Sequence, residues 1–151
     1  MKTGMLTALF ALLGCIAFAG EQLGFELRLV SEESSSTTKE YSLPERKGVS
    51  EKVHAEAAVL LESSAVQSAR VSRGGDGTHS IEITFTESGA KQFAEITSQN
   101  TGKRIAILIG GQVYSAPVVR EPILGGSAQI TGNFTAEEAA RLAAIVSGSK
   151  G

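Results

Sequence analysis

A cluster of glycines at residues 74–77, Gly-Gly-Asp-Gly, constrains the fold of this chain more than any other sequence feature. Such a cluster is a strong turn signal. Residues 80–85 follow it and alternate apolar with polar side chains, which is typical of a half-buried strand. Residues 69–73 precede it, and we expect Val71 to point inward. The pattern predicts a β-hairpin.

A second glycine pair, Gly110-Gly111, suits a two-residue hairpin turn. Residues 104–109 before it form a continuous apolar run, which indicates a central strand, and residues 112–115 would return as its partner. Pro117 then ends regular pairing. A last short strand is predicted at residues 128–131.

Two helices are predicted in the C-terminal half. Residues 87–99 place apolar side chains at helical spacing, with Thr86 or Ser88 as the cap and Asn100 and Gly102 at the end. Thr135 and Glu138 form a T-x-x-E capping box for a closing helix over residues 136–146. Its apolar face consists of Ala139, Leu142, Ala143 and Val146.

The N-terminal part is less clearly patterned. Phe25, Leu27 and Leu29 alternate with charged residues and predict a strand. Residues 31–40 are polar and of low complexity, which predicts a flexible loop, and residues 41–43 form a short strand before Pro44. Residues 52–70 combine helix-favouring Ala and Leu with strand-favouring Val, and periodicity does not decide between the two.

The order of elements is strands, helix, hairpin, strand, helix. It predicts an α+β fold in which two main helices pack on a mostly antiparallel sheet. We divide the chain into a signal segment at 1–19, a strand-containing part at 20–67 and an α+β domain at 68–146.

The first twenty residues read as an export signal. Lys2 is followed by a short apolar run, and Ala17-Phe18-Ala19 supplies small residues before a cleavage site after Ala19. An alternative is a lipobox at Leu12-Leu13-Gly14-Cys15, which would make Cys15 a lipidated N-terminus. We therefore expect an exported, periplasmic or extracytoplasmic protein, with a lipid anchor in the second case. No apolar run beyond residue 20 is long enough to span a membrane.

Composition argues against several functions. The formal net charge is −2, with 14 Lys and Arg against 16 Asp and Glu, so no nucleic-acid partner is expected. The two histidines lack ligands at metal spacing, so neither metal nor cofactor is expected. Asp76, His79 and Ser80 suggest a catalytic triad, but residues so close on a turn and a strand point in different directions. We predict a protein that is not an enzyme.

The C-terminal half contains a set of short motifs in a fixed order: FTESGAKQFAEIT at 85–97, Asn100, GKRIAI at 102–107, GQVYSAP at 111–117, Gly125-Gly126, ITGNFT at 130–135 and EEA at 137–139. Together they resemble the extracytoplasmic head of SecD, the accessory subunit of the bacterial Sec export machine. The resemblance covers residues 68–143 and weakens toward Phe25. Where SecD proteins often have Asp-Gly at the hairpin turn, this chain has Gly110-Gly111, which serves the same turn.

The resemblance implies a role in protein transport. SecD-type proteins are multi-span membrane subunits that work with SecF on the proton gradient, and their head holds the emerging polypeptide. Without membrane spans this chain cannot be a complete motor. We expect a free-standing SecD-head-like domain that binds unfolded or exported polypeptide in the cell envelope and assists export, with Sec translocon components as further partners. The alternative is a structural adaptor for one specific envelope partner.

An exposed sheet edge could bind polypeptide by adding a strand. We place this site at residues 113–119 and the following glycine loop, and we expect that replacing Tyr114 and Val118 by Asp abolishes binding while leaving stability largely intact. The predicted binding residues are Val113, Tyr114, Ser115, Pro117, Val118, Gly125 and Gly126.

Overall fold

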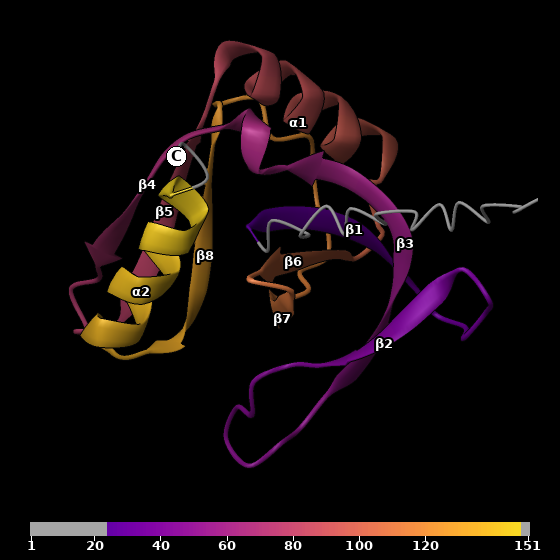
Figure 1. The fold of residues 1–151 in the computed structure, drawn as a ribbon, viewed down its shortest axis with the longest axis horizontal. Helices are drawn as coiled ribbons and strands as arrows, with labels where there is room; N and C mark the ends of the chain where they lie inside the picture. Colours follow the sequence, from indigo (N-terminus) through magenta and orange to yellow (C-terminus); the bar gives the residue numbers. More distant parts are fainter. Residues whose placement is uncertain (1–23, 149–151) are drawn as a thin grey trace, which may run out of the picture.

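A computed structural model describes residues 24–148 of the chain (Figure 1). The expected signal segment, with Cys15, lies outside the described residues. The elements in chain order are β1 (Phe25–Ser31), β2 (Thr38–Ser42), β3 (Lys52–Glu62), the 3₁₀ turn η1 (Ser63–Ala65), β4 (Val66–Arg73), β5 (His79–Phe85), α1 (Glu87–Gln99), β6 (Ile105–Ile109), β7 (Gln112–Ser115), β8 (Ser127–Phe134) and α2 (Ala136–Ser147).

The strands form two sheets, and within each sheet every described pair of neighbouring strands is antiparallel. One sheet has five strands in the order β2-β3-β1-β6-β7, and the other has three in the order β4-β5-β8. Together with two helices, this confirms the predicted α+β class, with two sheets in place of one.

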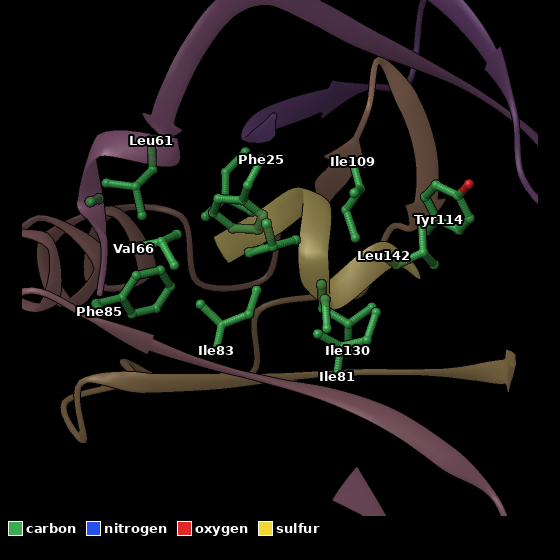
Figure 2. Close-up of a cluster of buried hydrophobic side chains, with 14 of the residues drawn as sticks. Phe25, Leu61, Val66, Ile81, Ile83, Phe85, Ile109, Tyr114, Ile130 and Leu142 are labelled. Carbon is green, nitrogen blue, oxygen red and sulfur yellow. The ribbon is translucent and has the colours of Figure 1, made fainter. Parts of the chain in front are cut away.

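The main core lies between the two sheets and both helices. It joins Phe25 and Leu61 of the five-stranded sheet to Ile81 and Ile130 of the three-stranded sheet, with Leu142 of α2 (Figure 2). Residues of the expected strand-containing part (20–67) and of the expected α+β domain (68–146) therefore contribute to the same core. Burial of this apolar surface is the dominant favourable term in the stability of such a fold.

A second cluster lies on the other face of the five-stranded sheet. Its buried members include Val53 and Ala55 of β3, Leu108 of β6 and Val113 of β7. The two edge strands β2 and β7 contact each other, so the five-stranded sheet curls around this cluster. Both faces of β6 are covered, which explains its continuous apolar sequence.

The helices have the predicted bounds to within one residue. The Thr86 hydroxyl accepts a hydrogen bond from the N–H of Gly89 and so caps α1, and the Thr135 hydroxyl accepts from the N–H of Glu138 at 3.1 Å and caps α2. Helix α2 packs against β4 and β5, and α1 lies beside β3, η1 and β5 (Figure 1). The predicted apolar face of α2 is its buried face.

The close packing of α1 depends on one glycine. A Cβ atom at Gly89 would lie 2.3 Å from the Ala65 carbonyl oxygen and 2.9 Å from the Ala65 Cβ. Real Cβ atoms do not approach other atoms so closely. The glycine therefore allows the first turn of α1 to pack against η1.

The structure shows the ambiguous stretch at 52–70 as two strands, β3 and the start of β4, joined by the 3₁₀ turn η1. Val53 and Ala55 are buried while their neighbours are not, and β3 pairs with β1 on one side and β2 on the other. This pairing with distant segments outweighs the helix propensity of the local sequence. The predicted loop at 31–40 is shorter, because Ser31 belongs to β1 and β2 begins at Thr38.

Two further expectations need correction, and a third, for Val71, holds in direction but not in full burial. Strand β8 runs over Ser127–Phe134 and is twice as long as predicted. Pairing continues beyond Pro117, because Arg104 and Val118 form an isolated antiparallel bridge. Val71 lies opposite the buried Ile81 and so faces inward, but β4 is an edge strand and Val71 remains 37% exposed.

Candidate functional site

An apolar groove of about 350 Å³ opens between the two sheets near the end of α1. Its walls come from both sheets, from α1 and from residues 117–123. Phe93 and Thr97 contribute from α1, Ile105 from β6, and Ala128 and Gln129 from β8. The groove is the candidate functional site because it combines an apolar lining with access from the surface.

Exposed aliphatic side chains stand at the rim of the groove. Val118 and Ile123 line it and are 49% and 39% exposed, and the neighbouring Leu124 is 75% exposed. The charged side chains of Arg120 and Glu121 also line it and lie on its exposed side. Aliphatic side chains left in water beside an apolar hollow are typical of a surface that binds a partner.

The segment that carries Val118 is held by main-chain bonds. The N–H of Ile105 donates to the Pro117 carbonyl at 3.0 Å, and the N–H of Val119 donates to the Lys103 carbonyl at 2.8 Å. The Arg104 guanidinium donates to the Ala116 carbonyl at 2.8 Å and pairs with Glu51. One wall of the groove is therefore rigidly attached to β6.

The loop that carries Ile123 is fixed from the opposite side. The N–H of Ile123 donates to the hydroxyl oxygen of the buried Thr97 at 2.9 Å. The loop then reaches β8 through Gly126, whose φ of 69° is in the left-handed region that favours glycine. Gly125 shows no such requirement, and a Cβ there would meet open space.

The predicted binding residues are only partly accessible. Pro117 and Val118 line the groove, and Gly125 and Gly126 lie in the loop beyond its rim. Val113 is fully buried in the second cluster, and Tyr114 is 8% exposed, with its side chain in the main core. Ser115 is half-buried on β7.

The side chain of Tyr114 lies in the core (Figure 2), and its ring is near that of Phe134. The expectation that an Asp at position 114 leaves stability largely intact is therefore wrong. An Asp at this position would bury a charge without a partner and would damage the fold itself. Alternation along a short strand predicts one exposed face, but here the curled sheet covers one face of β7 and the main core the other.

Sequence reasoning missed the inner wall and part of the rim. Phe93 and Ile105 were predicted as helix and strand core residues, and only the juxtaposition of two sheets makes them line a groove. The adjacent pair Ile123-Leu124, between Pro122 and Gly125, was a usable signal, because two large aliphatic residues are unusual in a loop.

Two of the three triad-like residues near the first hairpin turn are hydrogen-bonded to groups outside the set. Asp76 accepts hydrogen bonds from the N–H and the hydroxyl of Thr78, and the side-chain bond in particular lowers the pKa of its carboxyl. The Ser80 hydroxyl bonds to the Ser72 carbonyl and to Gln129. Within residues 24–148, no three His, Cys, Asp or Glu side chains are grouped so that they could hold a metal ion.

The fold defines a two-sheet α+β domain with an open apolar groove, and comparison with known proteins shows its family. The family model described as SecDF, P1 head subdomain, matches residues 38–150. The chain therefore belongs to the SecDF P1 head family. The match begins well before Ser68, where the motif resemblance starts.

Curated relatives agree with this assignment. The protein translocase subunit SecDF of Thermus thermophilus is 44% identical over 87 residues, which are 58% of this chain and 12% of the relative. The protein translocase subunit SecD of Acidaminococcus fermentans is 43% identical over 87 residues, 58% of this chain and 21% of the relative. The chain thus spans about an eighth to a fifth of these proteins.

Solved structures extend the similarity over more of the chain. A crystal structure of SecDF in a super-membrane-facing form matches 84% of this chain and 19% of that chain, with a TM-score of 0.67 and 31% identity. A structure of SecDF, described as a membrane component that enhances protein export, matches 81% of this chain and 60% of that one, with a TM-score of 0.64 and 30% identity. Among the described residues of this chain, no helix is long and apolar enough to cross a membrane.

Proposed function

We propose that this domain binds extended, unfolded polypeptide outside the membrane and thereby assists protein export. The observation that carries the proposal is the open apolar groove with Val118 and Ile123 at its rim, on a domain of the SecDF P1 head family. The relatives are named as protein translocase subunits, and one solved SecDF structure is described as a membrane component that enhances protein export.

The chemistry of the groove suits such a ligand. Unfolded chains differ in sequence, so a site for many of them relies on apolar contact, which is non-directional, more than on specific polar contacts. The apolar lining is extensive, and the charged groups at the rim, Arg120 and Glu121, are of opposite sign. This arrangement favours aliphatic side chains of any extended segment without selecting for its charge.

Binding is tested with a fluorescent synthetic peptide of Val-Ser repeats flanked by lysines. We expect the wild-type domain to bind this peptide and the Val118→Asp variant to lose most of its affinity, because the aspartate places a charge beside the apolar lining. Val49→Asp is the matched control, because Val49 is 66% exposed and does not line the groove. Failure of the wild-type domain to bind the peptide would overturn the proposal.

The cellular partner is tested by photo-crosslinking from position 118, which is exposed, in place of the buried position 114. Many exported chains, or Sec components, would support the export role. A single stoichiometric envelope protein, with no affinity for the peptide, would favour the adaptor function. The signal segment at 1–19, lipidation of Cys15 as its alternative and the extracytoplasmic location belong to the same proposal.

A further inference from the structure

Strand β8 forms one edge of the three-stranded sheet. It pairs with β5 on one side, and the described part of the chain places no strand on its other side. An edge strand presents main-chain N–H and C=O groups that another extended chain can pair with. Ala128 and Gln129 of this strand also line the groove, so its free edge borders the candidate site.

The register shows which main-chain groups face outward. The N–H of Phe85 donates to the Gly126 carbonyl at 3.0 Å, and β5 pairs with β8 in an antiparallel register that places Ile83 opposite Ala128. In such a ladder, alternate residues bond to the same neighbour. Ala128 and Ile130 therefore bond to β5, and the main-chain groups of Ser127, Gln129 and Thr131 point away from it.

One of these outward groups is already occupied. The Arg46 guanidinium, from the loop between β2 and β3, donates to the Thr131 carbonyl at 3.0 Å, which independently supports the outward direction of Thr131. Arg46 also reaches the Tyr114 carbonyl of β7 at 3.5 Å. Arg46 thereby covers the end of the β8 edge at Thr131. The stretch of the edge at Ser127 and Gln129, beside the groove, stays uncovered by Arg46.

The opposite side of the groove also presents main-chain groups. Pro117 and Val119 bond to Ile105 and Lys103, and Val118 lies between them in a non-hydrogen-bonded bridge with Arg104. The alternation turns the N–H and C=O of Val118 away from β6. An extended segment in the groove would therefore find main-chain partners at β8 and an aliphatic side chain at position 118.

We propose that the polypeptide binds as an added strand on the free edge of β8, with its main chain paired to Ser127 and Gln129 and alternate side chains inserted into the groove. This proposal rests on the proposed function and specifies how the ligand is held. Main-chain pairing is common to all sequences, so it supplies affinity without sequence selection. Arg46 limits the length of the added strand at Thr131.

The test compares Gln129→Pro with Gln129→Ala, using the same Val-Ser peptide. Both variants remove the Gln129 side chain and its hydrogen bond to Ser80, but only proline removes the outward N–H. Proline is tolerated on an edge strand where its N–H would face away from the sheet. We expect Gln129→Pro to bind the peptide about tenfold more weakly than Gln129→Ala, as the loss of one main-chain hydrogen bond implies.

Equal peptide affinity of folded Gln129→Pro and Gln129→Ala overturns strand addition. If Val118→Asp still loses binding in that case, the groove and the proposed function stand without it. If Gln129→Pro does not fold, the wild-type domain is measured against two peptides N-methylated on complementary sets of alternate amides. If only one of the two methylated peptides loses binding, the added strand is supported. If both peptides bind equally well, the added strand is contradicted.

Discussion

The buried hydroxyl of Thr97 on α1 accepts a hydrogen bond from the main-chain N–H of Ile123, with 2.9 Å between oxygen and nitrogen. The same hydroxyl donates to the Phe93 carbonyl within the helix. This single oxygen therefore couples α1 to the loop that forms the rim of the groove. A side chain 26 residues away in sequence therefore holds the main chain of an aliphatic residue that lines the groove.

Replacing Thr97 by Val keeps the shape of the side chain and removes the acceptor. We expect the free energy of unfolding to fall by about 1–3 kcal/mol, because the Ile123 N–H loses its partner. Urea unfolding measures the stability, and hydrogen exchange of the Ile123 amide reports the bond itself. Thr97→Ser is the matched control, because it keeps the hydroxyl and should keep the Ile123 amide protected. Unchanged exchange in Thr97→Val would contradict this account.

Gly89→Ala should destabilise the domain although alanine favours helices. The intrinsic gain is about 1 kcal/mol, but the new Cβ would lie 2.3 Å from the Ala65 carbonyl oxygen, and forced overpacking typically costs about 1–3 kcal/mol. We expect a net loss, measured as a lower urea midpoint. Gly125→Ala serves as the control because its Cβ would meet open space. A Gly89→Ala variant as stable as the wild type would show that α1 does not pack closely on η1.

Tyr114→Asp should prevent folding, whereas Val118→Asp should not. Tyr114 is 8% exposed and packs near Phe134, and Val118 is 49% exposed. A buried aspartate without a partner costs several kcal/mol, which is a large part of the stability of a domain this size. Thermal unfolding, monitored by circular dichroism, distinguishes the Tyr114→Asp variant from the Val118→Asp variant. Tyr114→Phe should remain folded, which would show that the core needs the ring at this position.

Arg46→Ala should lower the free energy of unfolding by about 1 kcal/mol, because the Thr131 carbonyl loses a hydrogen bond that joins the β2–β3 loop to β8. The control is Arg141→Ala, an exposed arginine of α2 for which residues 24–148 show no side-chain hydrogen bond or ion pair. Chemical denaturation of both variants provides the measurement. If Arg46→Ala lowers the free energy of unfolding no more than Arg141→Ala does, Arg46 does not hold the β2–β3 loop against β8.

Stability at the first hairpin turn should depend on pH through Asp76. Hydrogen bonds from Thr78, the side-chain bond first, lower the pKa of this carboxyl from its usual value of 3.8. A group with a depressed folded pKa contributes stability that is present above its unfolded pKa and is lost as the pH falls through its folded pKa. We therefore expect wild type to exceed Asp76→Asn in stability near neutral pH.

The difference between these two proteins should shrink as the pH falls below about 4. Urea unfolding at several pH values measures it. Thr78→Val, which removes the donor hydroxyl, should reduce the same pH dependence. A constant difference between wild type and Asp76→Asn at all pH values would show that the Thr78 bonds do not favour the charged form.

Local sequence patterns were sufficient wherever an element is defined by its own residues. The bounds of α1, the capping of both helices and the two glycine hairpins follow from spacing and turn chemistry, and Gly110 and Gly111 both have positive φ angles as a two-residue turn requires. The apolar face of α2 was likewise predictable, because its buried residues recur at helical spacing.

Tertiary structure decided the rest, because strand pairing and burial depend on residues far apart in the chain. Residues 52–62 form a strand because β1 and β2 pair with them, and Tyr114 is buried because it packs in the main core near Phe134 of β8. The inner wall of the groove has no local signature, since its residues come from α1 and both sheets. Local patterns of residues thus predict the helices, the turns and the family resemblance, whereas the packing of the two sheets leaves particular aliphatic residues exposed beside the groove.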